Sequence, residues 1–182
     1  MATKLPYGDA LNVIRRSTPL SVAAELLWQL LPPLTYTSRE LVITAVLEPH
    51  DRAGGDGFDY AVDHKRAFCG IFDAVGHDLQ AGQATAVALA AIRNARRGGQ
   101  RDLVTLAQLA DGEIITHGPR GRFVTAVLVD LDTSTGRLGY LAAGLAHKVL
   151  EHQGGLLQDD ATLLMLDWRP LHPGVAPLPG PG

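Results

Sequence analysis

Acidic residues gather beside small residues at three places in the chain. The first place is residues 54–59 (GGDGFD), the second is residues 72–78 (FDAVGHD) and the third is residues 158–162 (QDDAT). Hard divalent cations such as Mg²⁺ and Mn²⁺ take oxygen ligands, usually carboxylates from separate chain segments together with water. Neighbouring glycines let backbone carbonyls and water approach the ion. Taken together, the three acidic clusters indicate a metal site.

Such a site could serve hydrolysis of a phosphoryl group. Two metal ions about 3.5–4 Å apart can hold the attacking oxygen in line with the leaving oxygen. Asp56 and Asp73 are well placed for this if their strands form a hairpin. For a single cluster, the simpler interpretation is that aspartate beside glycine forms a turn. We keep that interpretation for Asp59, Asp63 and Asp132.

The elements that must position these residues are mostly strands. β-branched and apolar runs predict strands over residues 41–47, 58–62, 67–72, 123–131, 137–142 and 161–167, with turns at 63–66 and 133–136. Alanine-rich or periodic segments predict helices over residues 82–97, 102–110 and 145–153. Strands in hairpin pairs, interrupted by few helices, are typical of an α+β fold with antiparallel sheets and helices outside them.

The N-terminal region is predicted to hold one more helix. Leu20, Ala24, Leu27 and Leu31 recur at helical spacing, and Pro32 and Pro33 end the helix. Packing against the domain is the simplest role for this helix, and homodimerisation is the alternative. We expect a lead-in at residues 1–16, a main domain at 17–170 and a disordered tail rich in proline and glycine at 171–182.

Composition excludes several classes of protein. The formal net charge is −3 and the basic residues are scattered, so we expect neither nucleic acid nor a membrane surface as a partner. Cys69 is the only cysteine, which excludes a disulfide framework and a cysteine-based zinc site. No apolar run is long enough to span a bilayer, and the first residues carry no secretory signal. The expected location is the cytoplasm.

The order and wording of the motifs resemble a known family. GGDGFD, FDAVGHD, RFVTAVLVDLDTSTGRLGYLAAG and QDDATLLMLDW are similar to the PPM serine/threonine phosphatases, in particular the SpoIIE-like bacterial branch that regulates sigma factors and its actinobacterial members. The resemblance extends from about Val13 to Pro170. It implies a β-sandwich flanked by helices, with two Mn²⁺ or Mg²⁺ ions at one end.

The resemblance also implies roles for particular residues. Asp56 matches the aspartate that bridges the two metals, Gly57 offers its backbone carbonyl, and Asp73 and Asp159 match further ligands. Residues beside these ligands could contribute a second shell: Ala74, His77, Asp78 and Asp160. The implied reaction is hydrolysis of phosphoserine or phosphothreonine by metal-activated water, without a catalytic side-chain nucleophile. The implied substrate is a phosphorylated anti-anti-sigma factor of the STAS type.

Two local departures from the family pattern affect these assignments. The motif that usually reads G-H-G has Asp78 in its last position. We predict that Asp78 caps the following helix, and the alternative is that it joins the metal's water shell. Val75 stands where eukaryotic relatives carry a histidine proposed as a general acid, so that role is not transferred.

A larger departure follows Gly144. The family pattern continues there with A-G-H-x-P-P and a later L-Y-T-D-G motif whose aspartate is another metal ligand, but this sequence contains no Thr-Asp-Gly. Either residues are missing from the chain between Gly144 and Leu145, or the gene carries a deletion. A deletion would expose apolar neighbours. It would also favour a degenerate domain that binds a sigma-regulatory partner without turnover.

Overall fold

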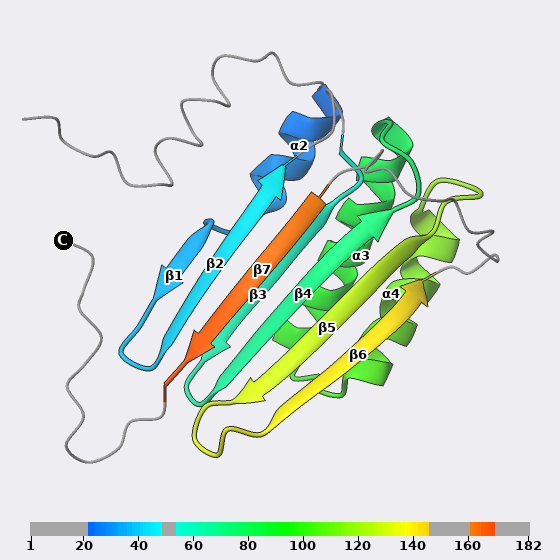
Figure 1. The fold of residues 1–182 in the computed structure, drawn as a ribbon. Coiled ribbons are helices and arrows are strands. Elements are labelled where there is room, and N and C mark those ends of the chain that lie inside the picture. The colour runs from blue at the N-terminus through cyan, green and yellow to red at the C-terminus, as the bar shows by residue number, and fades with distance from the viewer. Residues whose placement is uncertain (1–21, 49–53, 146–160, 170–182) are drawn as a thin grey trace, which may run out of the picture.

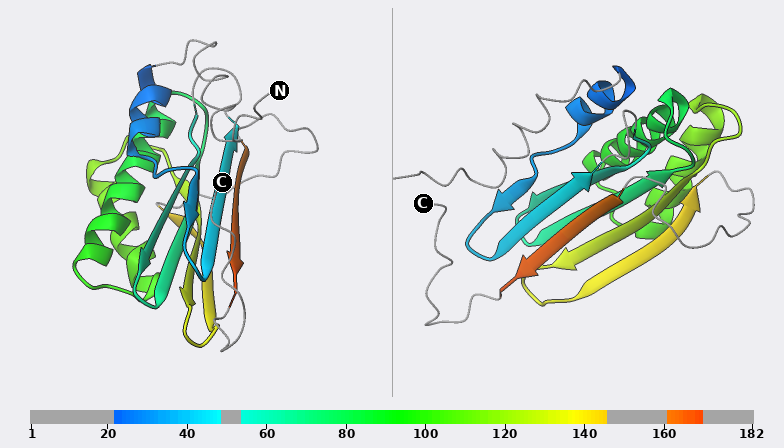
Figure 2. Two further views of the ribbon diagram at one scale, coloured as in Figure 1. Left: turned by 90° about the vertical axis from the view of Figure 1, so that its left-hand side faces the viewer. Right: turned by 45° about the horizontal axis from the view of Figure 1, so that its top comes forward.

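Two antiparallel sheets stack face to face, and helices cover the outer face of one of them (Figures 1 and 2). The computed structural model describes residues 22–48, 54–145 and 161–169. In Figure 2 (left), α3 and α4 lie on the side of the larger sheet that faces away from the smaller sheet. This arrangement confirms the predicted α+β fold with antiparallel sheets and outer helices.

The larger sheet has four strands in the order of the chain. They are β3 (Gly57–Asp63), β4 (Arg66–Ala74), β5 (Val124–Asp132) and β6 (Leu138–Leu145), each antiparallel to the next. The predicted hairpin between residues 58–62 and 67–72 is therefore present as β3 and β4. Its tight turn has His64 in a left-handed conformation, with φ at 46°.

The smaller sheet joins segments from both ends of the chain. Its order is β1 (Thr35–Thr37), β2 (Leu41–Glu48) and β7 (Ala161–Trp168). β7 lies antiparallel to β2 along its whole length, from Leu41 opposite Trp168 to Glu48 opposite Ala161. The short strand β1 has no counterpart among the predicted strands.

The helices pack on the larger sheet. α3 (Leu79–Arg97) and α4 (Leu103–His117) lie against its outer face, and α2 (Val22–Leu30) contacts α3. Phe72 and Leu128 from the sheet and Ile92 from α3 are fully buried in this layer. α3 begins three residues earlier than predicted because Asp78 caps it, and α4 extends beyond Ala110 to His117.

A smaller apolar layer lies between the two sheets. It contains Ile43 of β2, Cys69 of β4 and Leu131 of β5, with Trp168 of β7 packed against them. Burial first, and then the negative charge of Asp59, raises the pKa of the Cys69 thiol to about 12. Cys69 is therefore a buried apolar residue, as its place in a strand predicts, and is unreactive at neutral pH.

The smaller sheet covers only part of the larger one. β7 contacts β3 and β4, and Figure 1 shows it lying across them while β6 extends beyond it. The side chains that β5 and β6 present to the uncovered side are correspondingly exposed: Val127 at 43%, Leu138 at 53% and Tyr140 at 74%. Val127, Leu138 and Tyr140 therefore form an exposed apolar patch on the larger sheet.

Leu145 corrects one prediction. It was expected to begin a helix over residues 145–153, but it ends β6 opposite Val124, and its side chain is buried. The pairing continues through Gly144, which lies opposite Thr125. The remainder of that predicted helix, the lead-in 1–16 and the tail 171–182 lie outside the described residues. None of the described helices is long and apolar enough to cross a membrane.

The partial cover predicts unequal effects of two leucine truncations. Leu128→Ala should lower the free energy of unfolding by about 2–5 kcal/mol, because it empties a fully buried position. Leu138→Ala should change it by no more than about 0.5 kcal/mol, because the side chain is already half exposed. Urea denaturation of the two variants measures the difference. Equal, large losses would mean that another part of the protein covers Leu138.

The Asp78 cap predicts a pH-dependent contribution to stability. Its carboxylate accepts a hydrogen bond from the Ala81 N–H at 3.0 Å, and this bond and the nearby Arg122 hold the pKa of Asp78 below its ordinary value of 3.8. Asp78→Ala should lower the free energy of unfolding by about 0.5–2 kcal/mol at pH 7, and Asp78→Ser should lower it much less.

A carboxyl group with a lowered pKa stabilises the fold fully above its unfolded pKa, and that contribution disappears as the pH falls through the folded value. The difference in free energy of unfolding between wild type and Asp78→Ala should therefore become smaller below about pH 4. Urea titrations across this range measure it, and a difference that stays constant with pH would contradict a charged cap.

Candidate metal centre

The register of β3 and β4 places Asp56 opposite Asp73. Gly57 pairs with Phe72, and the next position along this antiparallel register sets Asp56 opposite Asp73. The contact persists beyond them, because the Ala74 N–H donates to the Gly55 carbonyl at 3.4 Å. Directly opposed residues in antiparallel strands point to the same face, with Cβ atoms about 4.5–5.5 Å apart. The two aspartates therefore form one acidic pair at the end of the hairpin.

This pair faces the space between the two sheets. Phe58, two residues after Asp56, is buried against β2, and Cys69, four residues before Asp73, lies in the layer between the sheets. Side chains two or four residues apart in a strand share a face. Asp56 is only 6% exposed, whereas Asp73 is exposed. The Asp56 carboxylate is thus buried within the sandwich, and the Asp73 carboxylate is open to solvent.

A third segment reaches the pair from the other sheet. The Thr162 hydroxyl, near the start of β7, donates to Asp56 Oδ2 at 2.7 Å. Thr162 closes the D-D-x-T motif, so the hydrogen bond joins the first acidic cluster to the third. Asp159 and Asp160 lie outside the described residues. Thr162 was not among the predicted site residues, although its place in the D-D-x-T motif was a signal for such a role.

Gly55 permits the close packing that supports this end of the hairpin. A Cβ atom there would lie 2.7 Å from the carbonyl oxygens of both Ala74 and Gly76, which no side chain can tolerate. The Gly55 carbonyl also accepts a hydrogen bond from the buried Thr85 hydroxyl of α3. Gly55 therefore serves backbone packing, in addition to the ligand access expected of the glycines in this motif.

The loop after Asp73 is held by Arg122. Gly76 has φ at +88°, a conformation that favours glycine. Arg122 Nη1 donates to the Val75 carbonyl at 2.9 Å, and Nη2 pairs with the Asp78 carboxylate. Asp78 therefore acts as a helix cap and an ion-pair partner, which agrees with the capping prediction. Nothing in the sequence pattern indicated Arg122.

The other two residues proposed for a second shell differ in exposure. His77 is exposed on the loop between Gly76 and Asp78. The side chain of Ala74 is buried in the layer between the sheet and the helices, so only its backbone faces the end of the hairpin.

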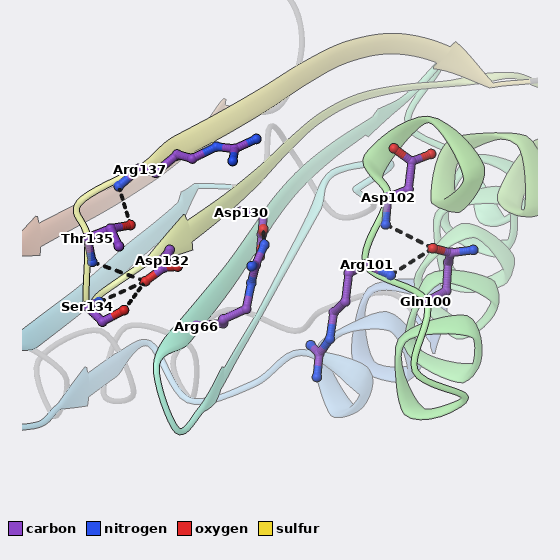
Figure 3. A network of polar contacts seen from close by, with 9 residues as sticks. All are labelled: Arg66, Gln100, Arg101, Asp102, Asp130, Asp132, Ser134, Thr135 and Arg137. Atoms are coloured by element: carbon purple, nitrogen blue, oxygen red, sulfur yellow. Dashed lines mark hydrogen bonds and ion pairs between the residues drawn. The ribbon is translucent and has the colours of Figure 1, made fainter.

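The aspartates interpreted as structural have three different environments. Asp132 accepts hydrogen bonds from the N–H groups of Ser134 and Thr135, forming the predicted turn (Figure 3). Asp63 ends β3 and pairs with Arg101 at 3.1 Å. Asp59 is not in a turn, because it lies within β3 and is buried against two arginines of α3. Its role depends on tertiary packing that a local pattern does not show.

The donor set suits a hard cation but is incomplete within the described residues. Asp56 and Asp73 supply carboxylate oxygens, the ligands that Mg²⁺ and Mn²⁺ prefer. The described part of the chain contains no group of three or more histidine, cysteine, aspartate or glutamate residues arranged to hold a metal ion.

Comparisons with known proteins found one family similarity and several similar solved structures. Residues 63–146 match the family model of stage II sporulation protein E (SpoIIE). This match includes Asp73 and Asp78 but ends short of Asp56 and of Thr162. No match was found among curated protein sequences.

Solved structures supply the fold. The SiaA-PP2C domain of Pseudomonas aeruginosa has a TM-score of 0.54 at 19% identity, over 91% of this chain and 70% of that one. The RsbU and RsbW domains of a Mycobacterium tuberculosis protein give a TM-score of 0.53 at 23% identity. That similarity covers 60% of this chain and 32% of the tuberculosis chain. The central part of the chain is therefore similar to the SpoIIE family, and the solved structures show that the chain has the fold of a PP2C domain.

Proposed function

We propose that the chain hydrolyses phosphoserine or phosphothreonine in a protein substrate. The observation that carries the proposal is the convergence of Asp56, Asp73 and Thr162 at one end of the sandwich. Two motifs joined by one hairpin meet there through carboxylates, and the third motif, about a hundred residues later, joins them through Thr162. Catalysis of phosphoryl transfer consists mainly of positioning and charge neutralisation, and an acidic site that gathers divalent metals suits this task.

The roles of the residues follow from their burial and contacts. We assign Asp56, Asp73 and Asp159 as ligands for two Mn²⁺ or Mg²⁺ ions, with Gly57 contributing its backbone carbonyl. When bound, these ions would activate water at neutral pH and neutralise charge on the phosphoryl oxygens. Asp56 is buried and its Oδ2 is committed to Thr162, so its orientation is set by the protein. Asp73 is exposed, which leaves its side of the site accessible to a bulky phosphoprotein.

The proposed substrate is a phosphorylated anti-anti-sigma factor of the STAS type. The match to the SpoIIE family supports a role in sigma-factor regulation. The similarity to a structure that contains RsbU and RsbW domains agrees with such a role. We further propose that the protein acts in the cytoplasm.

A second candidate is a phosphatase-like domain that binds such a partner without turnover. Two observations favour it. The sequence lacks the Thr-Asp-Gly motif that supplies another metal ligand in the family. The exposed apolar patch of Val127, Leu138 and Tyr140 on the larger sheet is also what loss of neighbouring strands would leave. This candidate predicts a stable complex with a phosphorylated partner and no release of phosphate.

Charge removal at the acidic pair tests the catalytic proposal. With Mn²⁺ or Mg²⁺ present, the full chain should release phosphate from a phosphoserine peptide or a phosphorylated STAS protein. Asp56→Asn and Asp73→Asn should each lower the rate by on the order of 10²-fold or more, because each removes a charged metal ligand. Asp167→Asn is the matched control, since Asp167 is an exposed carboxylate on the far part of β7.

The possible results separate the two candidates. The enzyme is supported if a chelator abolishes phosphate release and added metal restores it. Activity should then be lost in Asp56→Asn and Asp73→Asn but kept in Asp167→Asn. Binding of the phosphoprotein with no release in the presence of either metal supports the non-catalytic domain. Equal rates in Asp73→Asn and wild type would contradict the assignment of this residue.

Thr162 is predicted to act by positioning Asp56. Thr162→Val removes the donor to Asp56 Oδ2 while keeping the shape of the side chain, and Thr162→Ser keeps the donor. Loss of such an outer hydrogen bond typically costs about 10–100-fold in metal affinity or activity. We expect this loss for the valine variant and near-normal values for the serine variant, with Mn²⁺ affinity measured by electron paramagnetic resonance. Equal Mn²⁺ affinity in both variants would show that the hydrogen bond only joins the sheets.

A further inference from the structure

Four arginines gather at the end of the sandwich opposite the acidic pair. Arg93, Arg96 and Arg97 lie on the last turns of α3, and Arg101 follows in the turn before α4. With Asp59, Tyr60, Ala61 and Asp63 of β3 they line a cavity of about 330 Å³. α3 separates the two ends, and its 19 residues span roughly 28 Å. We call this cavity the arginine pocket.

The arginine pocket carries an excess of positive charge in a chain whose formal net charge is −3. Asp59 pairs with Arg93 at 2.7 Å and with Arg96 at 3.5 Å. Asp63 pairs with Arg101 at 3.1 Å. Two carboxylates thus face four guanidinium groups. Arg97 is exposed and forms no ion pair with any other residue in the described part of the chain.

The environment of Arg96 shows that the residues of the arginine pocket do not balance all of its hydrogen-bonding groups and charges. Its side chain is only 10% exposed, and its guanidinium lies 4.2 Å from the centre of the Phe68 ring. Its Nε is buried and has no hydrogen-bond partner among the described residues. Burial is the main cause that lowers the pKa of Arg96, and the positive charges of Arg101 and Arg93 lower it further. The negative charge of Asp59 acts in the opposite direction and raises this pKa. An additional anion in the pocket would offset the mutual repulsion of these guanidinium groups.

The helix dipole accounts for only part of this arrangement. Cations are favourable in the last turn of a helix, which explains Arg96 and Arg97 on α3. Arg101 lies beyond the helix in a turn held by Gln100, whose side-chain oxygen accepts from the N–H groups of Arg101 and Asp102 at 2.8 and 2.9 Å (Figure 3). Figure 3 shows the Arg101 side chain leaving this turn on the side away from Asp102. The turn therefore adds a fourth guanidinium to the pocket independently of α3.

We propose that the arginine pocket binds a dianionic phosphate group. Guanidinium groups are planar forks that donate paired hydrogen bonds to phosphate oxygens, and several of them converge here. The formal excess of two positive charges equals the charge of a phosphate dianion. The site is separate from the metal centre, so it binds phosphate in the absence of metal.

Titration of the full chain with inorganic phosphate tests the proposal. The titration is followed by isothermal calorimetry, with a chelator present and the ionic strength held constant, because screening would otherwise mask the charge effect. Wild type should bind phosphate saturably. Arg97→Gln and Arg101→Gln should each weaken binding about tenfold or more, since each removes a charged donor. Arg137→Gln is the matched control, because Arg137 is exposed on the β5–β6 turn.

Folding and the source of phosphate are controlled in the same experiment. Urea midpoints equal to wild type show that the glutamine variants are folded. O-Phosphoserine forms a second arm: tighter binding than phosphate indicates an esterified ligand, and equal binding indicates the free ion, both in support of the site. The proposal is overturned if phosphate does not bind saturably, if chloride competes equally, or if both pocket variants bind like Arg137→Gln. Binding that needs metal and is lost in Asp73→Asn would place the phosphate at the metal centre and would also overturn it.

Discussion

The candidate site depends on the antiparallel register of β3 and β4. This register sets Gly57 opposite Phe72, and therefore Asp56 opposite Asp73 with both side chains between the sheets. A shift of one residue would turn one aspartate towards the helices and separate the pair. The register is held at one end by the tight turn at His64 and at the other by Gly55, which leaves no room for a side chain against the backbone of Ala74.

The two ends of the sandwich have opposite chemistry, and α3 connects them. Asp78 caps the start of this helix beside the acidic pair, and Arg96 and Arg97 end it at the arginine pocket. Asp56, which immediately precedes β3, points between the sheets, while Asp59 of β3 points towards α3. Four consecutive residues thus include a carboxylate for the proposed metal centre and a buried counter-charge for the arginine pocket.

Much of the fold was predictable because its signals are local. The β3–β4 hairpin follows from two apolar runs around a polar turn, and the Asp78 cap follows from an aspartate placed just before an alanine-rich helix. Roles that rest on distant contacts were not predictable in this way. Leu145 opens a segment with helical periodicity, but pairing with Val124 and burial keep it in β6. Thr162, Thr85 and Arg122 acquire their functions only where separate segments meet.

Counting the Mn²⁺ ions that the full chain binds tests whether the acidic end of the sandwich is a metal centre. Electron paramagnetic resonance of the full chain titrated with Mn²⁺ reports free and bound ion without requiring a substrate. If the acidic end is a metal centre, Mn²⁺ should bind saturably, approach two ions per chain and be displaced by Mg²⁺. An absence of saturable Mn²⁺ binding by the folded full chain would contradict it and would leave the convergence of Asp56, Asp73 and Thr162 as a purely structural contact.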